Sequence, residues 1–434
     1  MKHRQNQMMK FFKNFLLLFL IGFLINSAYL QASNSSDEMI DSFSRNPFST
    51  YHCIKNEKAI AFIYDDGTVY AWGDPKYGGN YTLSVPATKQ ATYITSSSNA
   101  FTVLFNDGTV QTWGGCASPQ LIIGKKVLGV ASTGTAFAAL FDDGTIQCWG
   151  EADAGGVTPT LPAGKKVKAL SSTSFAFTAM LDDGTVQSWG DPNAGGTTPT
   201  NFPPEKKIMR MASTGSAFVA LFDDGTIQCW GNPNSGGTTP TLPAGMKVDS
   251  IASTQSAFAA VLENPNDDSR TILAWGDPAN GGTAPTIPIG SPMLAYIFAT
   301  DHAFTAVFGD FNIQTQNTLL SWGDGHYGGV TPTIPTGHIS QFAATSRAFA
   351  LLMEDQKTLV VWGDKDSGGQ QPYLNGDQVV WIGSSDGAFA AVCMNQWSDG
   401  IKIIHAWGDT TMGGIDPGSR PYNNISPFIT GFTY

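Results

Sequence analysis

The sequence has few charged residues and few cysteines. Only 14% of its 434 residues are charged, against roughly 25% in an average domain. The polar part of the surface must therefore consist largely of Ser, Thr, Asn and Gln. Acids outnumber bases by 35 to 24, which gives a formal charge of −11. This balance argues against nucleic acid as the main partner, because binding the phosphate backbone requires clustered Lys and Arg.

Groups that could carry catalysis or bind a metal are also scarce. The five cysteines are too scattered for a disulfide scaffold, and no C-x-x-C pair is present to bind zinc. Cys148 and Cys229 each precede a recurring Trp, where other copies carry small residues, so we expect them to be small buried side chains. The six histidines have no metal-ligand spacing. The sequence therefore predicts no cofactor, no metal and no enzyme activity.

Residues 1–32 have the build of a secretory signal. A basic head precedes the apolar run 15–25, and Ala32 fits the last residue before cleavage. We expect a signal peptide over 1–32, a linker over 33–48 and a secreted or periplasmic protein with no stable membrane association after cleavage. The alternative is an uncleaved membrane anchor, because residues 14–30 provide 17 residues, the short limit for spanning a bilayer.

From Tyr51 onward one phrase recurs, and it is clearest in residues 127–156, VLGVASTGTAFAALFDDGTIQCWGEADAGG. Nine copies end in Trp-Gly, 36 to 47 residues apart, and a period near 40 indicates a repeat architecture. No segment after residue 40 has helical periodicity over more than a turn or two. The nine Trp residues, predicted to be structural anchors, are Trp72, Trp113, Trp149, Trp189, Trp230, Trp275, Trp322, Trp362 and Trp407.

Each copy is expected to form three strands, as in 127–132, 135–141 and 145–149, and a fourth would have to be short and lie in the Gly-Gly and Pro-rich link. Asp142-Asp143-Gly144 predicts a tight hairpin, since Gly tolerates positive φ. Both faces of the middle strand are apolar, which indicates that neighbouring sheets cover both. This pattern favours an all-β protein, a β-propeller over residues 49–434 of about seven to nine blades.

Two further features concern how the blades meet. Trp149, at the end of the third strand, is expected to fill the space between blades, while Gly150 lets the chain turn away. Residues 425–430 follow the last Gly-Gly link at the spacing of a new first strand. We expect this segment to pair with the first blade and so close the ring.

Residues 131–140, with Asp143-Gly144 and Trp149-Gly150, resemble the repeat of the regulator of chromosome condensation family. They are also similar to the shorter repeat of β-lactamase inhibitory protein type II. The resemblance covers residues 50 to about 434 and implies a propeller. It also implies guanine-nucleotide exchange on a small GTPase as an alternative function. The sequence departs from the family phrase by placing Thr133 at a Gly position and Ala136-Phe137 in place of His-Ser.

Differences between copies predict where a partner binds, because insertions in repeat proteins collect in loops. Hairpins 263–270, 309–317 and 395–400 are longer than the others, and they bring residue types suited to interface anchors. These are Arg270, Phe311 and Trp397. The alternative is that the insertions are merely tolerated on the surface.

A second candidate cluster lies in the links at the opposite rim. It contains Tyr77, His326 and Tyr327. The alternative for these residues is packing against the neighbouring link. The sequence thus favours a non-enzymatic, exported, monomeric propeller that binds a protein partner through its loops. Besides nucleotide exchange, carbohydrate or small-ligand binding is the remaining alternative.

Overall fold

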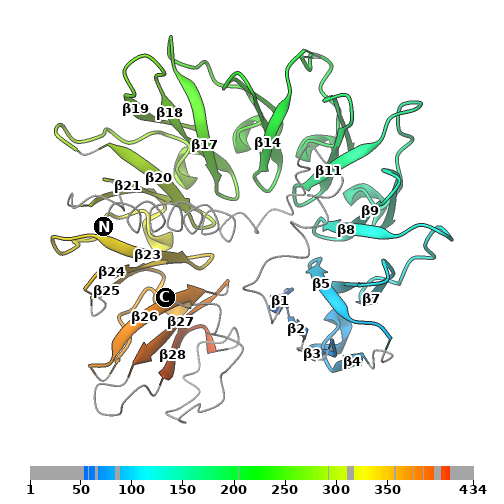
Figure 1. The fold of residues 1–434 in the computed structure, drawn as a ribbon, viewed down its shortest axis with the longest axis horizontal. Coiled ribbons are helices and arrows are strands. Elements are labelled where there is room, and N and C mark those ends of the chain that lie inside the picture. Colours follow the sequence, from blue (N-terminus) through cyan, green and yellow to red (C-terminus); the bar gives the residue numbers. More distant parts are fainter. Residues whose placement is uncertain are drawn as a thin grey trace, which may run out of the picture. The chain divides into compact units, whose positions relative to one another are not determined.

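The computed structural model describes residues 53–410, apart from 57, 64–66, 84–87, 204, 292, 310–316, 356–357, 375, 385 and 395–401. Over this part of the chain the protein is all-β, with nine antiparallel sheets that follow one another in sequence (Figure 1). Nine successive sheets of this kind are the blades of a β-propeller built from repeats, as predicted. The predicted signal peptide, the linker and the closing segment 425–430 lie outside the described residues.

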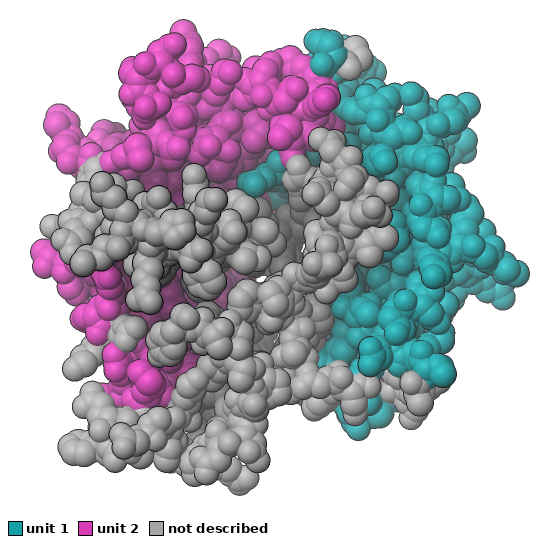
Figure 2. All heavy atoms as spheres, viewed as in Figure 1, with its two compact units in different colours: residues 1–205, 210–213 teal, residues 206–209, 214–434 magenta. Residues whose placement is uncertain are grey.

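The chain divides into two compact units (Figure 2). Unit 1 consists of residues 1–205 and 210–213, and unit 2 consists of residues 206–209 and 214–434. In unit 1 the strands are β1 Cys53–Lys55, β2 Ala59–Ile63, β3 Val69–Gly73 and β4 Tyr81–Leu83; β5 Ala91–Ser96, β6 Ala100–Phe105 and β7 Val110–Gly114; β8 Val127–Ser132, β9 Ala136–Phe141 and β10 Ile146–Gly150; β11 Val167–Ser172, β12 Ala176–Leu181 and β13 Val186–Gly190.

The fifth sheet begins with β14 Ile208–Ser213, through which the division passes. The remaining strands are β15 Ala217–Phe222 and β16 Ile227–Gly231; β17 Lys247–Ser253, β18 Ala257–Glu263 and β19 Arg270–Gly276; β20 Leu294–Ala299, β21 Ala303–Phe308 and β22 Thr318–Gly323; β23 Ile339–Ala344, β24 Ala348–Met353 and β25 Leu359–Gly363; β26 Gln378–Ser384, β27 Ala388–Met394 and β28 Lys402–Gly408.

Short 3-10 turns follow seven of the third strands. They are η1 Pro75–Tyr77, η2 Ala152–Ala154, η3 Pro192–Ala194, η4 Pro233–Ser235, η5 Pro278–Asn280, η6 Gly325–Tyr327 and η7 Lys365–Ser367. Among the described residues no helix has the length and apolar character needed to cross a membrane.

Eight sheets have three strands and the first has four, because β4 pairs with β3. In five of the other sheets a hydroxyl of the following link accepts an N–H at the outer edge of the third strand. The Thr158 hydroxyl accepts the Cys148 N–H at 2.8 Å, and Thr198 does the same for Ser188. An edge strand with free N–H groups can pair with another chain. By accepting one of these N–H groups, the Thr-Pro-Thr link protects the edge as a fourth strand would.

The predicted hairpin forms at Asp142-Asp143-Gly144. The Phe141 N–H donates to the Thr145 carbonyl at 2.9 Å, and the Gly144 N–H donates to the Phe141 carbonyl at 3.0 Å. Gly144 has φ +82°. This is a three-residue hairpin loop in which the left-handed position falls on Gly, as this type of turn requires.

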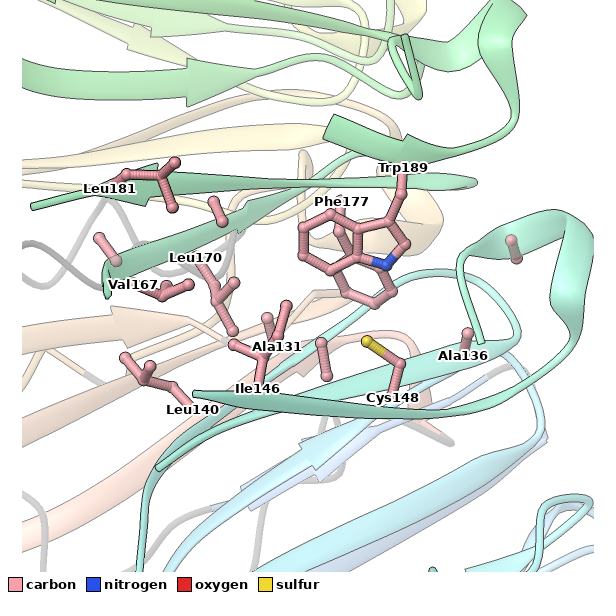
Figure 3. Packing of buried hydrophobic residues seen from close by; sticks show 14 residues of the cluster. Ala131, Ala136, Leu140, Ile146, Cys148, Val167, Leu170, Phe177, Leu181 and Trp189 are labelled. Atoms are coloured by element: carbon pink, nitrogen blue, oxygen red, sulfur yellow. The ribbon is translucent and has the colours of Figure 1, made fainter. Parts of the chain in front are cut away.

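The middle strands are buried on both faces, as their composition predicts. Phe137, Ala139 and Phe141 of β9 pack with residues of the preceding sheet. Ala136, Ala138 and Leu140 lie in the cluster shared with the following sheet, which includes Leu170, Phe177 and Trp189 (Figure 3). Each described interface of this kind is a separate apolar core between two neighbouring sheets.

A bulge interrupts the first strand of most sheets. In β8 the register with β9 shifts between Val127 and Gly129. Because side chains otherwise alternate between faces, the extra residue places Val127 and Val130, three positions apart, on the same face toward the preceding sheet. The same pairs in other sheets are Ala91 and Ile94, Val167 and Leu170, Leu294 and Ile297, and Val379 and Ile382.

Candidate functional site

In six of the sheets the recurring Trp forms a hydrogen bond to the link that precedes the sheet. The Trp189 ring stacks on Phe177 of its own sheet, with centroids 5.4 Å apart. Its indole N–H donates to the Gly155 carbonyl, in the link that follows the preceding sheet, at 3.0 Å. Similar bonds to a link glycine are made by Trp113, Trp275, Trp322, Trp362 and Trp407. Eight of the nine anchors are buried, and the side chain of Trp72 lies outside the description.

The first glycine of each Gly-Gly link packs against this stacked pair. Gly155 has φ +91°, and a Cβ built there would lie 2.6 Å from Cδ2 of Phe177. Only a residue without a side chain allows the link to approach the Phe and Trp rings so closely. The sequence identified Gly-Gly only as part of the link after each Trp, but its first glycine also packs against the Phe and Trp of the next sheet.

A buried threonine joins the turn after the first strand to the link of the same sheet. The Thr133 hydroxyl accepts the Ala136 N–H at 3.1 Å and donates to the Ala154 carbonyl at 3.0 Å. Thr173, Thr214, Thr254, Thr300 and Thr345 repeat the bond to the link. The Thr that replaces the family's Gly is therefore structural. It places the turns and the links at one rim, which we call the turn–link rim.

Backbone hydrogen bonds connect successive turns along this rim. In unit 1 the Gly134 N–H donates to the Ser174 carbonyl at 2.7 Å. In unit 2 the series runs from Gln255 to Asp301, from Asp301 to Ser346 and from Ser346 to Asp386, with N···O distances of 2.7 to 2.8 Å. Within each unit these bonds hold the turns of neighbouring sheets side by side. In each turn, the residue after the one that makes this bond, such as His302 after Asp301, is therefore held close to a link.

In unit 2 this arrangement assembles an aromatic and charged cluster around Tyr327, which we call the Tyr327 cluster. The His302 ring meets the Tyr327 ring edge-on, with centroids 4.3 Å apart. The Arg347 guanidinium lies 5.3 Å from the centre of the same ring and 3.7 Å from the Asp364 carboxylate. Half of the Arg347 side chain is exposed. His326, next to Tyr327, is exposed as well.

His302 is the least expected member of this cluster. Burial lowers the pKa of its imidazole, and the Arg347 charge lowers it further, whereas the Asp324 and Asp277 carboxylates raise it. The net effect is a lowered pKa, which favours the neutral ring at neutral pH. Its Nδ1 atom is buried without a hydrogen-bond partner among the described residues. The imidazole therefore acts here mainly as a packing surface for Tyr327.

The equivalent positions carry smaller residues in five other sheets, whereas the first sheet also carries a tyrosine. Where Tyr327 stands, the other 3-10 turns end in Ala154, Ala194, Ser235, Asn280, Ser367 and, in the first sheet, Tyr77. Where His302 and Arg347 stand, three other turns carry Thr135, Ser216 and Ser256. A fourth carries Phe175, which is 49% exposed. The Tyr327 cluster is thus a local departure from the repeat.

The other predicted binding residues have different surroundings. Tyr77, in unit 1, lies under the Lys58 ammonium, which is 4.8 Å from its ring centre. Arg270 donates to the Glu263 carboxylate at 2.7 Å and to the Leu294 carbonyl at 3.4 Å. The guanidinium of Arg270 is therefore used within the chain. Phe311 and Trp397 lie outside the described residues.

The opposite ends of the sheets carry a repeated ion pair. Lys165 Nζ lies 2.7 Å from Oδ2 of Asp183 in the hairpin of the same sheet. The pairs Lys89 with Asp107, Lys125 with Asp143, and Lys206 with Asp224 repeat it. Hydrogen bonds from Lys165 and Thr185, which outweigh partial burial, lower the pKa of Asp183 to about 2. In each of these hairpins the lysine compensates the charge of the aspartate carboxylate, so the carboxylate does not require a bound cation.

These carboxylates predict an acid-sensitive fold. A carboxyl whose pKa falls from an ordinary 3.8 to about 2 on folding stabilises the fold while it is ionised, so its contribution is complete above pH 3.8 and lost toward pH 2. We expect the urea midpoint to fall over that window. A chain with Asp107, Asp143, Asp183 and Asp224 all changed to Asn should show a shallower fall. An equally steep fall in the variant would contradict this explanation.

No metal or thiol chemistry is apparent in the part of the chain that the structure describes. It contains no group of three His, Cys, Asp or Glu side chains placed to bind a metal ion. Burial raises the pKa of the Cys148 and Cys229 thiols to about 12, so neither forms a thiolate at neutral pH. Both are small buried side chains, as their position before the Trp predicts.

Comparison with known proteins gives similarities only among solved structures. No family model and no curated protein matches the chain. The ectodomain of the Physcomitrella patens receptor kinase CR4 is 16% identical, with a TM-score of 0.39, over 67% of this chain and 77% of that one. Prp20p from Saccharomyces cerevisiae is 16% identical, with a TM-score of 0.36, over 62% and 83%. Yeast RCC1 (Prp20) bound to Kap60 is 13% identical, with a TM-score of 0.37, over 79% and 80%.

Proposed function

We propose that this protein is a non-enzymatic, exported propeller that binds a protein partner through the Tyr327 cluster. The observation that supports it most directly is the contact of Tyr327 with His302 and Arg347 on the turn–link rim. Tyr and Arg are enriched among the residues that dominate protein interfaces. The export component rests on the secretory character of residues 1–32.

The cluster is pre-organised for such a role. Tyr327 is held by the Thr300 hydroxyl, which donates to its carbonyl at 2.8 Å, and by two side chains against its ring. A side chain that is already ordered loses less conformational entropy when a partner binds. Arg347 is half exposed and has one ion pair, at 3.7 Å. Its planar group can therefore donate to a partner's carboxylate or carbonyl groups.

The test compares two matched double variants in a pull-down with the full chain as bait. Tyr327→Ala with Arg347→Ala removes the cluster, and Ser256→Ala with Asn280→Ala changes equivalent rim positions in the preceding sheet. Loss of one such anchor, at roughly 2 kcal/mol, weakens binding by about 30-fold, so loss of both should weaken binding by more than that factor. We expect this loss only in the first variant. Equal recovery of every partner by both variants would show that the Tyr327 cluster does not bind a partner.

The extended hairpins are tested separately by Phe311→Ala with Trp397→Ala. Loss of partner recovery in this variant, with full recovery by the Tyr327 and Arg347 variant, would move the binding surface to the hairpins. Nucleotide release from a panel of small GTPases tests the exchange activity implied by the family resemblance. Accelerated release would replace the proposal of a purely binding function.

A further inference from the structure

The part of the turn–link rim that surrounds the Tyr327 cluster carries an excess of negative charge. Among the described residues of unit 2, the bases in the turns and in the first residues of the links are Arg347 and Lys365. A partner that docks here is therefore attracted if it is basic and repelled if it is acidic. The carboxylates at the same positions are Asp277, Asp301, Asp324, Asp364, Asp366, Asp386 and Asp409.

Two of these carboxylates belong to the turns on either side of the Arg347 turn. The Asp301 N–H donates to the Ser346 carbonyl, and the Ser346 N–H donates to the Asp386 carbonyl, both at 2.8 Å. Arg347 follows Ser346, so an acidic residue stands in each neighbouring turn. The turns of the second to sixth sheets carry no charge at this position, where they have Ser98, Gly134, Ser174, Gly215 and Gln255. Within unit 2 the acidic turns therefore flank the Tyr327 cluster.

Asp324 provides an oxygen atom at the cluster itself. Its Oδ1 accepts the His326 N–H at 2.8 Å and so caps η6. Its charge opposes the burial that lowers the pKa of His302, because the carboxylate lies near that ring. Among the described residues its Oδ2 has no hydrogen-bond partner. In the next link the equivalent oxygen, Oδ2 of Asp364, lies 3.7 Å from the Arg347 guanidinium.

We propose that the partner of the Tyr327 cluster presents a basic segment, with a Lys or Arg side chain that donates to Oδ2 of Asp324. This inference rests on the proposed binding function and names the chemistry of the partner. Arg347 provides the precedent within the chain, since its guanidinium is held between the Tyr327 ring and the cap carboxylate of a link. Arg347 then donates to backbone carbonyl groups of the segment, while the surrounding carboxylates attract its basic side chains.

The first experiment selects peptides from a random display library on the full chain and on the variant with Tyr327→Ala and Arg347→Ala. Peptides recovered only by the unaltered chain should carry more Lys and Arg than Asp and Glu, relative to the library. A neutral or acidic composition of these peptides would overturn the inference and leave the binding function standing. Recovery of the same peptides by both chains would contradict the proposed function, and the inference would fall with it.

The second experiment measures the affinity of one recovered basic peptide by fluorescence anisotropy. Asp324→Asn should weaken binding about tenfold, the effect of losing one hydrogen bond between charged groups. The variant keeps the cap of η6, because Asn232 caps η4 in the same way, with an oxygen that accepts the Asn234 N–H. An increase of the salt concentration should also weaken binding of the unaltered chain.

The matched control is Asp277→Asn. Asp277 caps η5 in the preceding link, but its Oδ2 already accepts an N–H of the Asn280 side chain. The control should weaken binding by less than about twofold, because a charge that is not bonded to the peptide is largely screened at physiological salt. Equal losses for Asp324→Asn and Asp277→Asn would show that Asp324 is not the acceptor of the basic side chain.

Discussion

Replacement of Trp189 by Ala should lower the free energy of unfolding by about 3–5 kcal/mol. The indole is only 8% exposed, and it fills the space between the third and fourth sheets together with Leu170 and Phe177 (Figure 3). Its removal leaves a cavity and an unpaired Gly155 carbonyl. Urea unfolding followed by circular dichroism would measure the loss.

The matched control for this prediction is Trp189→Phe. A phenyl ring keeps most of the stacking on Phe177 but cannot donate to Gly155, so the loss should be about 1–3 kcal/mol, the cost of a buried acceptor without its donor plus a small cavity. Stability of the Ala variant within about 0.5 kcal/mol of the unaltered chain, the range of an ordinary surface substitution, would refute the role of Trp189 as a buried anchor.

The second large effect is expected for Gly155→Ala, at about 2–5 kcal/mol. The left-handed backbone, with φ +91°, costs a residue with a Cβ about 1–2 kcal/mol. The new Cβ would also meet Cδ2 of Phe177 at 2.6 Å, and overpacking of this kind costs roughly 1–3 kcal/mol. The same urea unfolding experiment would measure the sum.

Gly164→Ala separates the two contributions. Gly164 also has a left-handed backbone, with φ +75°, but nothing lies within 4 Å of a Cβ built there. The Gly164→Ala variant should therefore lose only the stability that the left-handed backbone costs a residue with a Cβ, about 1–2 kcal/mol. Equal losses for Gly155→Ala and Gly164→Ala would mean that close packing of the link on the Phe177 and Trp189 rings contributes nothing to stability.

The strands were predictable because each depends on neighbours in the sequence. The expected 127–132, 135–141 and 145–149 differ by one residue at most from β8, β9 and β10. The hairpin at Gly144 follows from the backbone freedom of glycine, and burial of both faces follows from the apolar residues at every position of β9. Such features need only the local pattern and the rule that apolar faces are covered.

The candidate site was less predictable. His326 and Tyr327 could be selected from the sequence because they are adjacent and unlike the other links. Nothing local indicated that His302 and Arg347, 45 residues apart, would both contact the Tyr327 ring. Arg270 had the residue type of an interface anchor, yet its guanidinium pairs with Glu263. Residue type alone does not show whether a charged group is already engaged within the chain.

By itself the sequence determined the repeat, the three strands of each copy, the tight hairpins and the burial of both sheet faces, because these follow from short-range backbone preferences and apolar periodicity. Only the tertiary structure decided what the repeated Gly-Gly, Thr and Lys do and which rim residues meet. Each of those contacts joins positions 18 to 41 residues apart, and such distant pairs are brought together only when strands pair into a sheet and neighbouring sheets pack.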